Sequence, residues 1–157
     1  MLTIRPINEE DIAALAEVFV RVYESFDVGE RWSKESAQTL LGYWLKKQSD
    51  LAFLAEIDGR IVGGFLSGIK PWWDGNHLFD GEIFVHPEFQ KQKVGAALLK
   101  KVFQEAAEKY DAKTFDAFTF NGSDHPLTWY KKMGFREIKE WTMITGDIND
   151  ALEKLNY

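Results

Sequence analysis

The sequence of 157 residues contains no cysteine, only four prolines and no long apolar run. The absence of cysteine excludes disulfide bonds, thiolate metal sites and a thiol nucleophile on the protein, and it is compatible with the cytoplasm. No stretch approaches the length that crosses a membrane, and the N-terminal residues lack the long apolar region of a signal peptide. We therefore expect a cytoplasmic protein without a membrane partner.

The chain also lacks an excess of basic residues, since its formal net charge is −6. A general nucleic-acid-binding surface needs the opposite sign, so we expect no nucleic-acid partner, whereas a cationic partner suits the charge. His77, His86 and His125 fall in separate predicted elements, which argues against a metal site. Aromatic residues make up 15% of the chain, with six tryptophans, and such residues often line ligand sites.

The periodicity of apolar residues predicts a single mixed α/β domain over residues 1–157. The expected order is strand, two helices, three antiparallel strands, helix, strand, helix and two strands, followed by a polar tail. The expected strands are 2–7, 51–57, 60–69, 77–85, 114–120, 135–138 and 141–148. The expected helices are one capped by Asn8 that runs to about residues 23–26, one capped by Ser33, 93–110 and 125–133. Asp58-Gly59 predicts a tight hairpin turn, and Gly63, Gly64 and Gly68 suggest bulges or close backbone approach.

Residues 83–99 are the most informative stretch. They begin as an apolar strand, break at Pro87, cross a polar turn and enter a helix with a glycine and two alanines in its first turns. Such a turn aims several backbone N–H groups at one point, and the helix dipole adds partial positive charge there. Lys91 and Lys93 place two cations beside it. This stretch therefore predicts a site for a phosphate or pyrophosphate group.

The same residues resemble the acetyl-CoA loop of the GNAT N-acetyltransferases, whose pattern is Gln/Arg-x-x-Gly-x-Gly/Ala. Gln90 and Gly95 match this pattern, and the segment 130–135 is similar to the Tyr-x-x-x-Gly-Phe of the family's last helix and strand. The order of elements agrees across nearly the whole chain. The resemblance implies a GNAT fold, with a mostly antiparallel sheet, one parallel splayed strand pair and about four flanking helices.

The sequence departs from the family pattern at two positions. Lys93 stands where the family usually has glycine, and we interpret it as already entering the helix, where a right-handed φ tolerates a Cβ and the amine adds charge attraction. The family often has an asparagine seven positions before the tyrosine. That position is Ser123 here, so a cofactor contact would be lost or would move to Asn121.

The resemblance further implies acetyl-CoA as co-substrate, direct attack by an amine on the thioester, and backbone pairing of Phe84 and Val85 with the pantetheine arm. The loop residues whose amides would hold the pyrophosphate are Gln90, Lys91, Gln92, Lys93, Val94, Gly95 and Ala96. Tyr130 matches the family's general acid, and Glu82 stands where the family often places the general base. Asp80, two residues earlier on the same strand face, is the alternative base.

Several aromatic and acidic residues fall in regions that border the acceptor in the family, namely Tyr23, Phe26, Trp32, Trp72, Trp73 and Asp74. Core packing accounts for each of them alone, whereas as a set they predict an aromatic-walled, acidic pocket that attracts a cation. This pattern favours a small polyamine or an aminoglycoside-like amine as acceptor, with a peptide amine as a further option.

Two other functions fit parts of the pattern. A non-catalytic CoA-binding regulatory or sensor module would share the loop, but it would not need Tyr130 or the acidic residues of the preceding strand. A nucleotide-phosphate enzyme of another α/β kind is disfavoured by the early hairpin and by the lack of its glycine-rich motifs. The late strands leave an edge on which a homodimer could form.

Overall fold

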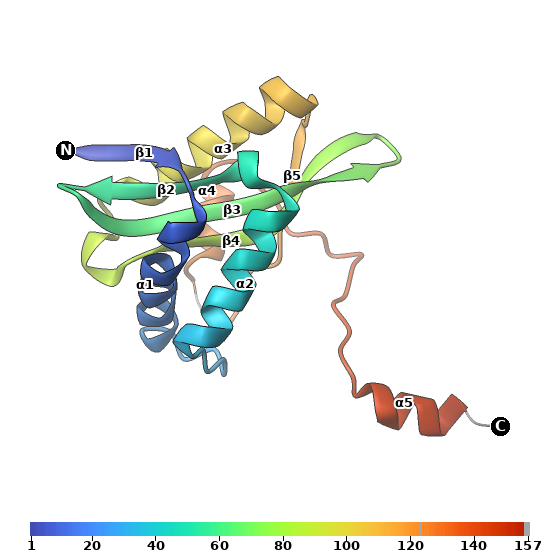
Figure 1. Ribbon diagram of the computed structural model, residues 1–157. Helices are drawn as coiled ribbons and strands as arrows, with labels where there is room; N and C mark the ends of the chain where they lie inside the picture. Colours follow the sequence, from blue (N-terminus) through green and yellow to red (C-terminus); the bar gives the residue numbers. More distant parts are fainter. Residues whose placement is uncertain (123, 156–157) are drawn as a thin grey trace. The chain divides into compact units, whose positions relative to one another are not determined.

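The computed structural model describes residues 1–122 and 124–155 (Figure 1). These residues divide into two compact units, Met1–Phe118 and a second unit that starts at Thr119. The first unit holds a sheet and three long helices, and the second holds two short helices. Among the residues described, no helix combines the length and the apolar composition needed to span a membrane.

A five-stranded sheet with its strands in sequence order forms the first unit. The strands are β1 (Leu2–Pro6), β2 (Ala52–Ile57), β3 (Arg60–Trp72), β4 (Gly75–Val85) and β5 (Thr114–Asp116). The first four pair antiparallel, and β4 and β5 form one parallel pair. Asp58 and Gly59 both have positive φ, 50° and 80°, as the predicted hairpin turn requires. The structure confirms a mostly antiparallel sheet with one parallel pair.

Three helices cover the two faces of this sheet (Figure 1). They are α1 (Ile12–Glu24), α2 (Lys34–Lys47) and α3 (Val94–Tyr110). Helices α1 and α2 share one face, where the ring of Phe19 packs edge-on against Phe84 of β4 with centroids 5.2 Å apart. On the other face Phe65 of β3 packs against Phe103 of α3, with centroids 6.5 Å apart. Both faces of the central strands are therefore buried.

Polar residues hold the starts of the first two helices. Ser33 caps α2 as predicted, because its Oγ accepts the backbone N–H of Ser36 at 3.1 Å. A 3₁₀ turn, Glu9–Asp11, precedes α1, and Asp11 Oδ2 accepts the backbone N–H of Asn8 at 2.8 Å. Both side chains thus provide acceptors for N–H groups that have no partner within the helix or turn.

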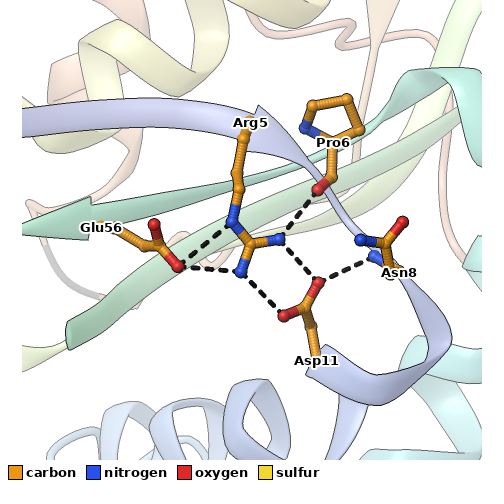
Figure 2. A network of polar contacts seen from close by, with 5 residues as sticks. All are labelled: Arg5, Pro6, Asn8, Asp11 and Glu56. Carbon is orange, nitrogen blue, oxygen red and sulfur yellow. Dashed lines mark hydrogen bonds and ion pairs between the residues drawn. The ribbon is translucent and has the colours of Figure 1, made fainter. Parts of the chain in front are cut away.

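Arg5 of β1 joins the sheet to the start of α1 (Figure 2). Its Nη1 and Nη2 each donate to one Asp11 carboxylate oxygen at 2.8 Å, and Nη2 also donates to Glu56 Oε1 of β2 at 2.8 Å. The hydrogen bonds from Arg5 lower the pKa of Asp11. This network therefore ties β1, β2 and α1 together while the carboxylates are charged.

The second unit corrects part of the sequence-based prediction. It contains α4 (Leu127–Lys132) and α5 (Ile148–Leu155), and the predicted strands 135–138 and 141–148 do not form. Asp147 Oδ1 accepts two N–H groups of the first turn of α5, at 2.8 and 3.0 Å, and apolar residues follow at helical spacing. This cap and the apolar period of 3.6 account for α5, which begins where the second predicted strand was expected to end. The alternating pattern of the two predicted strands supplies no ladder partner by itself. The polar tail that begins at residue 149 contains most of this helix.

Several boundaries also differ from the prediction. Strand β5 ends at Asp116 instead of continuing to residue 120, and β3 runs through the predicted loop to Trp72. Residues 73 and 74 are therefore the turn of a long β3–β4 hairpin. Helix α4 is followed by Gly134, whose φ of 92° allows the turn that the sequence predicted there.

Replacing Arg5 by glutamine is expected to lower the free energy of unfolding by about 1–2 kcal/mol at neutral pH, since it removes charge-assisted hydrogen bonds that solvent partly screens. Because the folded-state pKa of Asp11 is lowered, this contribution is present above its ordinary pKa of 3.8 and is lost as the pH falls through the folded value. Urea denaturation of both proteins across the acidic range measures the difference. Arg21→Gln, which removes an exposed pair with Glu24, is the control, and equal losses would contradict the role of the network.

Candidate functional site

Strand β4 carries a β-bulge at Asp80 and Gly81. Between Leu66 and Gly68, β3 advances by two residues while β4 advances by three. The two bulge residues have positive φ, 52° and 109°. A Cβ on Gly81 would lie 2.1 Å from the carbonyl oxygen of Leu66, so only glycine fits there. A bulge of this kind bends the strand and ends its regular pairing.

The parallel ladder between β4 and β5 ends immediately before this bulge. Its last pair is Phe79 with Asp116. Within the described part of the chain, no strand pairs with the same edge of β4 over residues 82–85. The bulge therefore leaves the backbone edge of the second half of β4 open.

The antiparallel ladder decides which backbone groups face this open edge. The N–H of His86 donates to the carbonyl oxygen of Val62 in β3 at 2.8 Å. Since the direction alternates along an antiparallel ladder, Phe84 also faces β3, whereas Ile83 and Val85 face the open edge. The Phe84 side chain belongs to the core and is 3% exposed. Phe84 and Val85 are the two strand residues predicted to pair with a pantetheine arm. The backbone of Val85 faces the open edge, as does that of Ile83, whereas the backbone of Phe84 faces β3.

The loop between β4 and α3 is held by its own side-chain amides. Gln90 Nε2 donates to the carbonyl oxygen of Val85 at 3.0 Å, and Gln92 Nε2 donates to the carbonyl oxygen of Glu88 at 2.9 Å. These contacts fasten the loop to the end of β4. The two glutamines therefore fix the path of the backbone, and their side-chain amides are already engaged.

Lys93 corrects an interpretation made from the sequence. It precedes α3 as the N-cap residue with φ 65° and ψ 9°, in the left-handed region, and it is not a right-handed residue inside the helix. Lys91 also has a positive φ, 62°. A left-handed conformation costs a residue with a Cβ about 1–2 kcal/mol, which is the physical reason for glycine at such a position. Both lysine side chains are exposed.

The first turn of α3 presents unpaired backbone N–H groups. The first intrahelical bond runs from Ala97 N to the carbonyl oxygen of Lys93 at 3.0 Å. The N–H groups of Val94, Gly95 and Ala96 therefore lack an acceptor within the helix. The 17-residue helix adds its dipole, and the positive φ values before it turn the loop backbone into a concave arrangement that suits an anion.

The two acidic side chains of β4 have different surroundings. The Asp80 carboxylate accepts backbone hydrogen bonds from Phe118 and from the following glycine, and it is attracted by Lys47, although burial raises its pKa. None of the hydrogen bonds and ion pairs found among the described residues involves the Glu82 carboxyl. Burial, together with the charges of Asp80 and Glu30, raises the pKa of Glu82 to about 8. Glu82 is therefore the side chain suited to exchange a proton near neutral pH.

Tyr23 of α1 lies near these carboxylates. Burial raises its pKa above the ordinary value, and so do three nearby charges, those of Glu82, Glu30 and Asp80. The indole N–H of Trp32 donates to Glu30 Oε2 at 2.7 Å, and the rings of Tyr23 and Trp32 have centroids 6.0 Å apart. The structure thus brings two predicted aromatic residues together with the acids of β4. Glu30 was not predicted from the sequence, where its only signal is its place beside Trp32 in a loop.

Other aromatic residues assigned to the acceptor side are placed differently. Phe26 packs against the core, and Trp73 is 87% exposed at the tip of the β3–β4 hairpin. The ring of Trp72 already faces a cation, because Lys70 Nζ lies 4.1 Å from its centroid. Phe26 thus packs on the same core cluster as Tyr23 and Trp32, whereas Trp73 is open to solvent.

The second unit holds the remaining candidates. Tyr130 lies in α4, and its ring packs edge-on against Phe135 with centroids 5.9 Å apart. The backbone N–H of Phe135 also donates to the carbonyl oxygen of Tyr130 at 3.3 Å, so the Tyr-x-x-x-Gly-Phe segment folds as one local turn. Asn121 is exposed before this helix, and Ser123 lies outside the described residues.

Comparison with known families assigns this arrangement. The model of the acetyltransferase (GNAT) family matches residues 10–135, which include the bulge, the loop and Tyr130. The chain belongs to the GNAT acetyltransferase family. The GNAT family uses acetyl-CoA, and the open strand edge followed by unpaired N–H groups fits an extended ligand that carries phosphates.

Relatives support this assignment to the GNAT family. The chain is 27% identical over 146 residues to an uncharacterized N-acetyltransferase of Methanocaldococcus jannaschii, which covers 88% of this chain and 64% of that relative. It is 27% identical over 118 residues to an N-alpha-acetyltransferase of Sulfurisphaera tokodaii, covering 68% of this chain and 69% of the other. The chain thus spans less than two thirds of the length of the first relative.

A solved structure supports the GNAT fold. An aminoglycoside N-acetyltransferase in complex with CoA superimposes with a TM-score of 0.72 at 18% identity, covering 93% of this chain and 95% of that one. The likeness at this identity concerns the fold alone. In the described part of this GNAT chain, no group of three or more side chains is arranged to hold a metal ion.

Lys93→Gly is expected to raise the free energy of unfolding by about 0.5–1 kcal/mol, because glycine adopts the left-handed φ without strain, while the unfolded chain gains some entropy. Thermal or urea denaturation measures the change. Lys93→Ala removes the same charge but keeps the Cβ, so it serves as the matched control. A glycine variant no more stable than the alanine variant would contradict the assigned backbone conformation.

Proposed function

We propose that the protein is an acetyl-CoA-dependent N-acetyltransferase that transfers acetyl directly to a primary amine of a small cationic molecule. The observation that carries this proposal is the continuity of the open edge of β4 with the unpaired N–H groups at the start of α3. An extended polar arm followed by a pyrophosphate matches that sequence of backbone groups. The family assignment supports the same ligand.

In this proposal the backbone does most of the binding of acetyl-CoA. The backbone groups of Ile83 and the N–H of Val85 would pair with the amides of the pantetheine arm as an added strand, since the Val85 carbonyl already accepts from Gln90. The N–H groups from Lys91 to Ala96 would hold the pyrophosphate, and the exposed lysine ammonium groups would add attraction that depends on salt. Gln90 supports the site indirectly, since its amide fixes the loop on Val85.

Glu82 is the proposed general base. A primary alkylammonium has a pKa of about 10.4, so the amine must lose a proton before its nitrogen can attack the thioester carbonyl. A carboxyl with a pKa of about 8 is a stronger base than an ordinary glutamate and can accept that proton directly or through one water. Asp80 is the weaker candidate, because backbone N–H groups already stabilise its charge.

Tyr130 is the proposed general acid. When the new amide bond forms, the bond between carbonyl carbon and sulfur breaks, and the leaving thiolate takes a proton from the phenol. The support for this role is the match of Tyr130 to the family motif, within the range of the family model.

The surroundings of Glu82 support a cationic acceptor such as a polyamine or an aminoglycoside-like amine. Three carboxylates and the Tyr23 ring lie close together, and the Trp32 indole holds Glu30 in place. An acidic, partly buried site attracts ammonium groups by charge and by the ring quadrupole. A peptide amine is the alternative acceptor, favoured by the N-alpha-acetyltransferase relative.

A thiol-release assay with acetyl-CoA over a panel of amines tests this function. The panel holds polyamines, aminoglycosides, amino acids and peptides with free N-termini. Release of CoA with at least one amine, with the acetylated amine identified by mass spectrometry, is the expected result. Tight CoA binding without release on any amine would instead favour a CoA-binding sensor module.

Glu82→Gln is expected to lower kcat/KM for the amine by about 10²–10³-fold, since general base catalysis is removed. In the wild type the activity should rise with pH as Glu82 loses its proton, with an apparent pKa near about 8, and the variant should lose this limb. Asp80→Asn is the comparison that separates the two candidate bases. Persistence of the limb in Glu82→Gln and its loss in Asp80→Asn would reverse the assignment.

Tyr130→Phe is expected to lower kcat by about 10²-fold while the Kd for CoA stays within about twofold, because the phenol donates a proton only as the sulfur leaves. Steady-state kinetics and calorimetry with CoA measure the two quantities. Tyr110→Phe is a matched control, since Tyr110 donates to Asp50 at the far end of α3. An unchanged kcat in Tyr130→Phe would remove the tyrosine from the mechanism.

A further inference from the structure

His77 of β4 lies between two carboxylates from different segments. Its Nδ1 is 2.5 Å from Asp116 Oδ2 of β5, and its Nε2 is 2.8 Å from Asp74 Oδ1 in the β3–β4 turn. The residue is 8% exposed. A charged carboxylate accepts hydrogen bonds and cannot donate them, so both contacts are hydrogen bonds only while both ring nitrogens carry protons and His77 is an imidazolium.

This cation spans the short parallel ladder, because His77 pairs with Thr114 at its start and its side chain reaches Asp116 at its end. β5 contributes only three residues to its ladder with β4, and Asp116, the last of them, is opposite Phe79. The bulge begins at the next residue of β4. The bond from His77 to Asp116 therefore fixes β5 at the last pair before the open edge.

We propose that His77 is a positioning residue for acetyl-CoA: by holding Asp116 and Asp74 together, its imidazolium sets where β5 leaves β4 and so the opening that receives the pantetheine arm. The inference rests on the proposed function, because it takes the open edge of β4 as the binding site of CoA. In this proposal His77 touches neither CoA nor the amine. It acts on CoA binding only by fixing the position of β5 beside β4.

The charges around His77 make the bond depend on pH. Asp116 from β5 and Asp74 from the turn face the ring, and Lys70 of β3 is opposite it in the ladder, with its ammonium over the rings of Trp72 and Phe79. The hydrogen bonds from His77 to Asp116 and Asp74 raise its pKa, against the effect of burial. The two hydrogen bonds from the His77 ring are therefore both present below its ordinary pKa of 6.5, and they are lost as the pH rises through the pKa of His77 in the folded protein.

Calorimetry with CoA on the full chain tests the proposal. His77→Gln should bind CoA about fivefold more weakly than the wild type at mildly acidic pH, a typical size for coupling between sites. His77→Lys, which keeps a cation between the carboxylates, should restore most of the affinity and keep it at alkaline pH, where the wild type weakens. Asp111→Asn, at an exposed aspartate paired with Lys113, is the matched control. Any change of affinity with pH that comes from the ionisation of CoA itself would be the same in this control and in the His77 variants.

An NMR titration of the His77 ring needs no variant and decides the case even where His77→Gln fails to fold. If the imidazolium favours CoA binding fivefold, CoA must raise the pKa of His77 by about 0.7, because linkage is reciprocal. A purely structural histidine would keep the same pKa with and without CoA. An unmoved pKa, or equal CoA affinity in wild type and a folded His77→Gln, overturns the proposal.

The outcomes also separate this inference from the proposed function. Coupling between His77 and CoA in a protein that acetylates no amine would support the positioning role and defeat the catalytic proposal. Acetylation of an amine without coupling between His77 and CoA would support the catalytic proposal and overturn the positioning role. Failure of the folded wild type to bind CoA would overturn both.

Discussion

The extra residue that β4 inserts at Asp80 and Gly81 fixes the arrangement of the whole site. Because Gly81 approaches the carbonyl of Leu66 more closely than any Cβ permits, the strand must bend there. The ladder with β5 stops at that point, which frees one backbone edge of β4 and turns its end toward the loop before α3. The open edge of β4 is a consequence of this one local irregularity, which also contains the first of the two acidic residues of the strand and directly precedes the second.

A binding site made mainly of backbone groups tolerates side-chain changes that a motif would forbid. The N–H groups at the start of α3 exist whatever residue stands at position 93, provided that the backbone takes the left-handed conformation there. Lys93 meets this requirement at an energetic cost. In the proposed complex with acetyl-CoA, its exposed ammonium would offset part of that cost by attraction to a phosphate.

The sequence predicts the parts of this protein that local rules control. The Asp58-Gly59 turn, the Ser33 cap and the helical period of α1 to α3 are of this kind. The N–H groups at the start of α3 that lack an acceptor within the helix also follow from a local rule. Backbone geometry that depends on contacts with distant residues could not be predicted from the sequence. Gly81 looks like any glycine in a strand until its distance to Leu66 is known, and the φ of Lys93 depends on a loop held by Gln90 and Gln92. The strands predicted after residue 134 were wrong, because alternation of apolar and polar residues does not show that a neighbouring strand is present to pair with.

Asp80 and Glu82 differ because only the Asp80 carboxylate accepts hydrogen bonds from backbone N–H groups. Both are partly buried on the same strand, and burial raises the pKa of each. Asp80 recovers part of the lost hydration from backbone N–H groups, so its charge serves the fold by holding the chain after β5. Glu82 recovers none, and the charge of its neighbour makes its own ionisation harder still. A carboxyl left in this state costs stability, and its raised pKa is the property that the proposed uptake of a proton from an amine would use.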